Sequence, residues 1–139
     1  MNHTELNQVA IKLSKAPKGI LAADESTNTI TKRFSDINVE STFENRRKYR
    51  ELLFKTKELN KCIGGVILYD ETIRQSTSEK IPFGKFLNEI GIMPGIKVDT
   101  GAIPIFPSSP EKVTEGIDGL GERLKAVSYT HLRAHETDR

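Results

Sequence analysis

The sequence has a single cysteine and no long apolar run. Cys62 cannot form a disulfide within the chain, and its neighbours Ile63 and Gly64 predict a buried thiol rather than a nucleophile. No apolar stretch approaches the roughly 18 residues that a membrane-spanning helix needs. The first residues also lack the apolar centre of a signal peptide. We therefore expect a cytoplasmic protein that has no part in a membrane.

The positive and negative charges of the chain nearly balance, with 21 Lys and Arg residues against 19 Asp and Glu residues. The net charge is only +2, which gives no general case for binding nucleic acid. Basic residues do cluster in the stretch RRKYR at 46–50, but such a run on an amphipathic helix is usually a solvated outer face. With 36% hydrophobic and 29% charged residues, the composition is typical of a folded globular domain.

The last thirteen residues, VSYTHLRAHETDR, differ abruptly from the rest of the chain. On a helix, the spacing of His131 and His135 could place two imidazoles on one metal ion. However, a DNA sequence that encodes VSYTHLRAHET resembles a transposon adapter used in sequencing libraries. We therefore expect residues 127–139 to be a non-native tail without a metal site. Residues 1–126 would then be the incomplete N-terminal part of a larger domain.

Short apolar runs and helical periodicity alternate along the chain. Buried strands are predicted at 19–23, 63–69 and 95–99. Helices are predicted near 4–16, 30–37, 41–53, 83–90 and 109–124. The alternation indicates an α/β fold with a parallel sheet covered by helices.

Several residues fit helix ends and inner faces. Thr4 is a candidate cap of the first helix, and Ser41 with Glu44 fits a capping box before the third. Ser109 followed by Pro110 fits the start of the last helix. The side chains expected to face inward on these last two helices are Tyr49, Leu52, Leu53, Val113, Ile117, Leu120 and Leu124.

Two architectures fit a parallel sheet of this kind, an open doubly wound sheet and a (β/α)₈ barrel. The sequence has no glycine-rich phosphate loop of the dinucleotide or P-loop type, which weakens the first. In a barrel, catalytic residues lie where the strands end, at the carboxyl face. Asp24, Asp70 and Asp99 all lie at the ends of predicted strands in this way.

Lys97 and Asp24 are the strongest candidates for residues that take part in the chemistry. Side chains alternate along a strand, so Lys97 and Asp99 share one face of the third strand, which points into the mouth of a barrel. There Lys97 could bind a phosphate, form a Schiff base with a carbonyl substrate, or simply pair with an acid. Asp24 could serve as a general base, as a charge partner for such a lysine, or as a helix cap.

Two hydroxyl residues follow Asp24. Ser26 and Thr29 could donate to a phosphate near a helix N-terminus, where main-chain N–H groups also point. Isolated residues of this kind are more often caps, so both interpretations stay open.

Five motifs together carry a family resemblance. In this order, GILAADEST, FENRRKYRELL, GGVILYDETI, GIKVDTG and GIDGLGER resemble class I fructose-1,6-bisphosphate aldolase, from about residue 17 to residue 125. The resemblance implies a TIM (β/α)₈ barrel, of which this chain covers about the first three βα units. It also implies reversible cleavage of fructose 1,6-bisphosphate into dihydroxyacetone phosphate and glyceraldehyde 3-phosphate in glycolysis and gluconeogenesis. The family's reaction runs through a lysine Schiff base, with no metal or cofactor.

The resemblance also implies roles for individual residues. Asp24 matches the catalytic aspartate that ends the first strand and assists the imine and proton-transfer chemistry. Ser26 and Arg33 match residues around the substrate phosphates, and Thr29 stands where many members have serine. Lys97 matches a lysine of the third strand that contacts substrate and does not form the Schiff base. The resemblance therefore assigns Lys97 to substrate binding and not to imine formation. The imine-forming lysine and the acid–base glutamate are expected on later strands, beyond this chain.

The resemblance further implies a homo-oligomer, a homotetramer when full length. Two alternatives to this function remain. One is a related class I aldolase that acts on another sugar phosphate. The other is a non-catalytic binding protein that uses the basic helix at 46–50, whose affinity for a nucleic acid would then fall steeply with salt.

Overall fold

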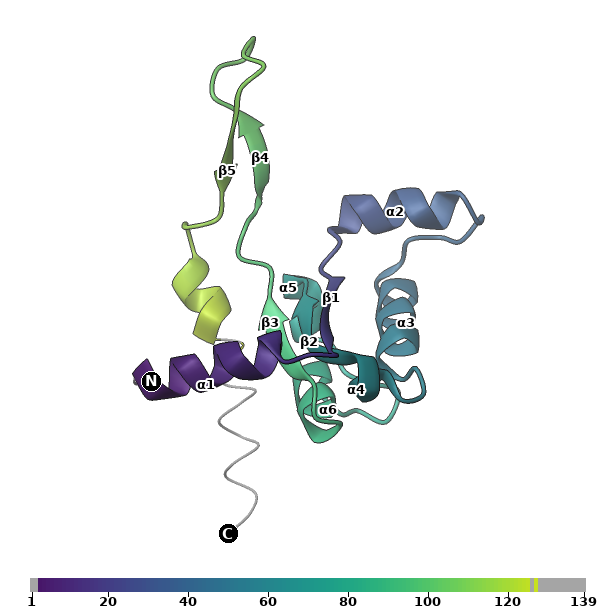
Figure 1. Ribbon diagram of the computed structural model, residues 1–139. Coiled ribbons are helices and arrows are strands. Elements are labelled where there is room, and N and C mark those ends of the chain that lie inside the picture. Colours follow the sequence, from purple (N-terminus) through teal and green to yellow (C-terminus); the bar gives the residue numbers. More distant parts are fainter. Residues whose placement is uncertain (1–2, 126, 128–139) are drawn as a thin grey trace.

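A three-stranded parallel sheet forms the centre of the protein. The computed structural model describes residues 3–125 and residue 127 (Figure 1). The sheet consists of β1 (Gly19–Ala23), β2 (Ile63–Leu68) and β3 (Met93–Ile96), in that spatial order. The strands are short apolar runs between polar segments, as expected of strands in a parallel sheet. The predicted α/β fold with a parallel sheet is therefore confirmed.

The helices connect and cover these strands. They are α1 (His3–Ser14), α2 (Thr27–Ser35), α3 (Phe43–Phe54), α4 (Leu59–Cys62), α5 (Asp70–Ile73) and α6 (Phe83–Glu89). A further helical segment covers residues 120–125. Within the described part of the chain, no helix combines the length and the apolar character needed to cross a membrane.

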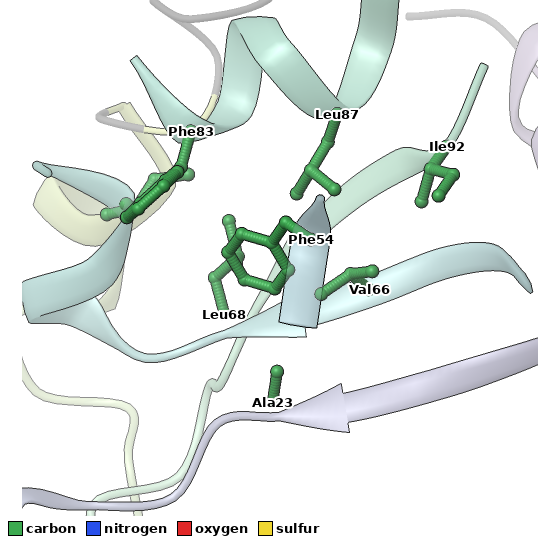
Figure 2. Close-up of a cluster of buried hydrophobic side chains, with 8 residues drawn as sticks. Ala23, Phe54, Val66, Leu68, Phe83, Leu87 and Ile92 are labelled. Carbon is green, nitrogen blue, oxygen red and sulfur yellow. The ribbon is translucent and has the colours of Figure 1, made fainter. Parts of the chain in front are cut away.

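The hydrophobic core lies on one face of β2. Phe54 from the end of α3 and Phe83 and Leu87 from α6 pack over Val66 and Leu68 of the strand (Figure 2). The rings of Phe54 and Phe83 meet edge to face, with centroids 5.2 Å apart. Because β2 is paired on both sides and covered by two helices, it is the most protected strand and the anchor of the sheet.

β1 has the predicted bounds but not the predicted burial. Among the described residues it pairs with β2 alone, so it is an edge strand. Ala23 at its end is fully buried, whereas Ile20 is 52% exposed. The helix α1 beside it buries little, because only Val9 and Leu13 are half-buried. The expectation of a buried strand was correct for β2 and wrong for most of β1.

Helix ends differ from the predicted caps in two places. Thr42, not Ser41, is the N-cap of α3, and its Oγ1 accepts the main-chain N–H of Asn45 at 3.1 Å. The capping box with Glu44 is therefore wrong, because the carboxylate of Glu44 pairs with Arg47 instead. Thr4 lies inside α1 rather than at its cap.

The inner faces of the helices were also only partly predicted. Leu53 is half-buried and Tyr49 is half-buried, but Leu52 is exposed. The buried positions next to them are Arg50, Glu51 and Phe54. The face of α3 that meets the sheet is thus rotated from the predicted one and carries charged side chains inward.

A β-hairpin takes the place of the first part of the helix expected at 109–124, of which only residues 120–124 are helical. β4 (Gly101–Pro104) pairs antiparallel with β5 (Lys112–Glu115), and this ribbon extends away from the parallel sheet (Figure 1). The Oγ of Ser109 accepts the N–H of Glu111, only two residues on, which is a turn contact rather than a helix cap. Ile117 is 87% exposed, so it has no inner face to line. The β-branched pair Val113 and Thr114 favours a strand here.

Candidate functional site

The register of the sheet brings three chain segments together at one edge. Ala23 is level with Leu68, and Leu68 is level with Ile96. The residue that follows each strand therefore emerges at the same edge, which places Asp24 and Lys97 there with Tyr69 between them. Lys97, predicted within the third strand, lies just past its end, where its N–H still donates to the carbonyl of Leu68 at 2.9 Å.

Lys97 lies between two carboxylates. Its Nζ is 2.8 Å from Oδ2 of Asp99 and 3.4 Å from Oδ2 of Asp24. The hydrogen bond to Asp99 and the charge of both carboxylates raise the pKa of Lys97, while its partial burial opposes the shift. The hydrogen bond from Lys97 in turn lowers the pKa of Asp99. The two carboxylates thus favour the ammonium form of Lys97 over the neutral amine that would attack a carbonyl carbon.

A cavity of about 420 Å³ opens at this edge of the sheet. Of the residues proposed from the sequence for catalysis or phosphate binding, Asp24, Ser26, Thr29 and Lys97 line it. The complete lining is Asp24, Glu25, Ser26, Thr29, Tyr69, Lys97, Asp99, Thr100, Gly101 and Arg123. Three carboxylates, four hydroxyl groups and two cations thus face one space, which suits a small polar molecule.

Ser26 and Thr29 belong to the cavity and to a helix cap at once. Ser26 is the N-cap of α2, and its Oγ accepts the N–H of Thr29 at 3.4 Å. The two hydroxyl oxygens are 3.1 Å apart. The cap brings both hydroxyls to the N-terminus of a nine-residue helix at the wall of the cavity. That position favours an anion, because the helix dipole and free N–H groups point toward it.

Arg33 reaches the site through Glu25. Its guanidinium forms an ion pair with Oε1 of Glu25, and the charge of Glu25 raises the pKa of Arg33. The side chain is 55% exposed and is not part of the cavity lining, whereas Glu25 is. Arg33 therefore lies next to the site rather than in it.

The basic run at 46–50 is not a solvated outer face. Arg46 pairs with Glu71 at 2.7 Å, and Arg47 pairs with both Glu44 and Glu51. Burial lowers the pKa of Arg50, which lies against Glu25 and is almost fully enclosed. The prediction failed because the partners of Arg46 and Arg50, Glu71 and Glu25, lie on other segments of the chain, while Arg47 pairs within its own helix. The three arginines of this run are thus all paired with carboxylates.

Arg123 is a cavity residue that the sequence did not reveal. It donates to the carbonyl oxygens of Lys97 at 3.2 Å, Val98 at 2.9 Å and Gly116 at 2.6 Å. One side chain thereby ties the segment after β3 to the end of β5. A residue with this role cannot be recognised from the sequence, because every residue has a main-chain carbonyl and no particular residue type marks the acceptors.

Cys62 and the tail complete the list of sequence predictions. Cys62 is exposed, so the expected buried thiol is wrong, and the reason is that it ends the short helix α4 at the surface. In the residues that the structure describes, no group of three His, Cys, Asp or Glu side chains could hold a metal ion. His131 and His135 lie outside those residues.

A family model named class-I fructose-bisphosphate aldolase, of the glycolytic type, matches residues 5–134. The chain belongs to this family. Among curated aldolases, the probable class 1 enzyme of Xanthomonas campestris is 52% identical over 125 residues, which is 90% of this chain and 37% of that protein. Fructose-bisphosphate aldolase 2 of Plasmodium berghei is 54% identical over 121 residues, 87% of this chain and 33% of that protein.

A solved aldolase has the same fold. The aldolase of Plasmodium falciparum, in a ternary crystal structure with TRAP and a small-molecule inhibitor, superposes with a TM-score of 0.85 at 50% sequence identity. The match covers 91% of this chain and 37% of that one. The chain thus has an aldolase-like α/β fold and spans about a third of the length of the aldolases it matches.

Proposed function

We propose that the complete protein is a Schiff-base aldolase that reversibly cleaves fructose 1,6-bisphosphate into dihydroxyacetone phosphate and glyceraldehyde 3-phosphate. The observation that carries the proposal is family membership along residues 5–134, at about half identity to curated aldolases. The enzyme would act in glycolysis, as the family description suggests, and we extend the proposal to gluconeogenesis and to a cytoplasmic location. The 139-residue chain on its own is expected to be inactive, because the family's imine-forming lysine lies on a later strand.

In this proposal, the cavity residues and the neighbouring Arg33 have two roles, proton transfer and phosphate binding. Asp24 is the catalytic residue of this chain and assists proton transfer at the imine, which its place in the cavity lining, 3.4 Å from the ammonium group of Lys97, supports. Ser26 and Thr29, with the N-terminus of α2, bind a substrate phosphate. Arg33 adds a second cation for the phosphate when it leaves Glu25.

Lys97 binds substrate rather than forming the imine. A Schiff base needs a neutral amine, and the two carboxylates beside Lys97 favour its charged form. As an ammonium ion, Lys97 offers three donors to the oxygens of a phosphorylated sugar. Its shared position with Asp24 allows both residues to contact one substrate.

The sheet is proposed to be the first part of a larger ring. β1, β2 and β3 pair in sequence order and place the cavity at their carboxyl ends, as the first three βα units of a TIM barrel would. The exposed side of β1 would then pair with the last strand of the barrel. The complete protein is proposed to be a homotetramer by family resemblance.

The test is activity of the complete protein from the full coding sequence. Triose phosphate release from fructose 1,6-bisphosphate, followed in a coupled assay, should be robust and unaffected by a metal chelator. Other sugar phosphates should be cleaved less efficiently in terms of kcat/KM. Efficient cleavage of another sugar phosphate, with fructose 1,6-bisphosphate left intact, would favour a related aldolase instead.

A further inference from the structure

Glu25 is gripped by side chains from two helices. Its Oε2 lies 3.1 Å from a guanidinium nitrogen of Arg50, and its Oε1 accepts a hydrogen bond from the hydroxyl of Tyr49 at 3.4 Å. Arg33 pairs with the same Oε1. The side chain of Arg50 is only 3% exposed and that of Glu25 is 14% exposed. A buried pair of this kind carries a large desolvation cost and is rarely justified by stability alone.

Arg50 also holds the main chain of Glu25. Its NH2 group donates to the carbonyl oxygen of Glu25 at 2.9 Å. The same nitrogen therefore donates a hydrogen bond to the peptide group of Glu25 and forms an ion pair with its carboxylate, whose Oε2 accepts no hydrogen bond from the described residues. Among the described residues, Nε and NH1 of Arg50 have no hydrogen-bond partner, so Glu25 is its main compensation for burial.

This grip acts on the segment that carries Asp24. On one side of Asp24, Ala23 is fully buried in the core at the end of β1. On the other side, Glu25 is held by Arg50, and Ser26 begins the cap of α2. The backbone is thus fixed immediately before and after Asp24. The direction of its carboxylate, toward Lys97 and the cavity, depends on both anchors.

We propose that Arg50 is a positioning residue that holds Glu25 so that the carboxylate of Asp24 is aimed at Lys97 and the cavity. The inference rests on the proposed function, in which Asp24 assists proton transfer. Arg50 itself is not among the residues that line the cavity. Its effect is transmitted through one peptide unit, so it should appear in the chemical step more than in binding.

Three variants of the complete protein separate this role from a general effect. Arg50→Met keeps the length of the aliphatic part of the side chain and removes every hydrogen-bond donor. We expect kcat to fall about 10–100-fold while KM changes less than about threefold. Arg50→Lys keeps the charge and should recover part of kcat. Arg47→Met is the matched control, since Arg47 is on the same helix and pairs with Glu44 and Glu51 away from the cavity. Its kcat should stay within about twofold of the unsubstituted value.

The decisive experiment is a double-mutant cycle with Asp24→Asn. If Arg50 acts through Asp24, Arg50→Met should reduce kcat by less than about threefold in the Asp24→Asn background. Arg50→Lys takes its place in the cycle if Arg50→Met does not fold. Equal losses in the two backgrounds would overturn the inference while leaving the aldolase function intact. An unsubstituted complete protein that does not cleave fructose 1,6-bisphosphate would overturn the proposed function, and this inference with it.

Discussion

The Nζ of Lys97 lies 3.4 Å from Oδ2 of Asp24, although 73 residues separate them in the sequence. Parallel pairing through β2 creates this proximity, because it levels the ends of β1 and β3. The pair is therefore set by the two strand ends, because each residue directly follows its strand. Its consequences can be tested in the complete protein.

Asp24→Asn keeps the size and most hydrogen bonds of the side chain but removes its charge. If Asp24 assists proton transfer, kcat should fall by roughly 10²–10⁴ while KM changes little. Steady-state kinetics with fructose 1,6-bisphosphate measure both. A variant with nearly normal kcat would reduce Asp24 to a structural residue at the start of α2.

Lys97→Met should weaken the binding of phosphorylated sugars. A hydrogen bond from a charged group contributes about 1.5–3 kcal/mol, so KM should rise by about 10–150-fold. Because its neighbours raise the pKa of Lys97, the ammonium charge persists above the ordinary lysine value of about 10.4. The contribution of Lys97 to substrate binding, and with it this part of KM, should therefore stay constant between pH 6 and pH 9. A KM that rises in step with an ionisation inside that range, absent from Lys97→Met, would contradict this assignment.

Glu51 links stability to pH. Burial alone would raise the pKa of Glu51, but hydrogen bonds from Lys55, Ser78 and Arg47 lower it well below the ordinary value. A lowered pKa means that the folded state binds the proton less readily than the unfolded state. The resulting stabilisation is complete above the unfolded pKa of about 4.3 and is lost as pH falls below it.

Glu51→Gln should accordingly lower the free energy of unfolding by about 1–3 kcal/mol at pH 7. Denaturant melts at pH 7 and pH 3 should show the difference from the unsubstituted protein narrowing at the lower pH. Glu44→Gln is the control, because Glu44 pairs with the same Arg47 but is exposed, and its effect should be much smaller. An equal effect at both pH values would show that Glu51 acts by packing rather than by charge.

Gly116 allows the end of β5 to approach the segment that carries Lys97. A Cβ at this position would lie 2.4 Å from the carbonyl oxygen of Val98, and its φ of +155° is strained for other residues. Gly116→Ala should therefore displace Val98 or the hairpin, which lowers the melting temperature and raises KM. Gly121→Ala is the control, since nothing lies within 4 Å of its Cβ and it is helical. Unchanged KM and melting temperature in Gly116→Ala would contradict the close approach.

The features that could be predicted from the sequence are those that depend on residues close together in the chain. β1 and β2 were located almost to the residue, because each is a short apolar run that ends in acids. Asp24 and Lys97 were placed at one edge because parallel strands end there together. The resemblance added Arg33 to the candidates, and its contact with Glu25 appears only in the folded chain.

Features that depend on distant partners escaped prediction. Nothing around Arg50 indicates burial, because Glu25 lies 25 residues earlier. The strand β5 was mistaken for the start of a helix, because Val113 and Ile117 also fit helical spacing. Arg123 binds main-chain oxygens, which leave no trace in residue type.

The most direct test of the central claim is borohydride trapping of the complete protein with fructose 1,6-bisphosphate, followed by peptide mass spectrometry. The account predicts one reduced adduct, on a lysine downstream of this chain, with Lys97 unmodified. Lys97→Met should still be labelled at saturating substrate. A labelled Lys97, or cleavage of fructose 1,6-bisphosphate with no adduct on any lysine, would contradict the account.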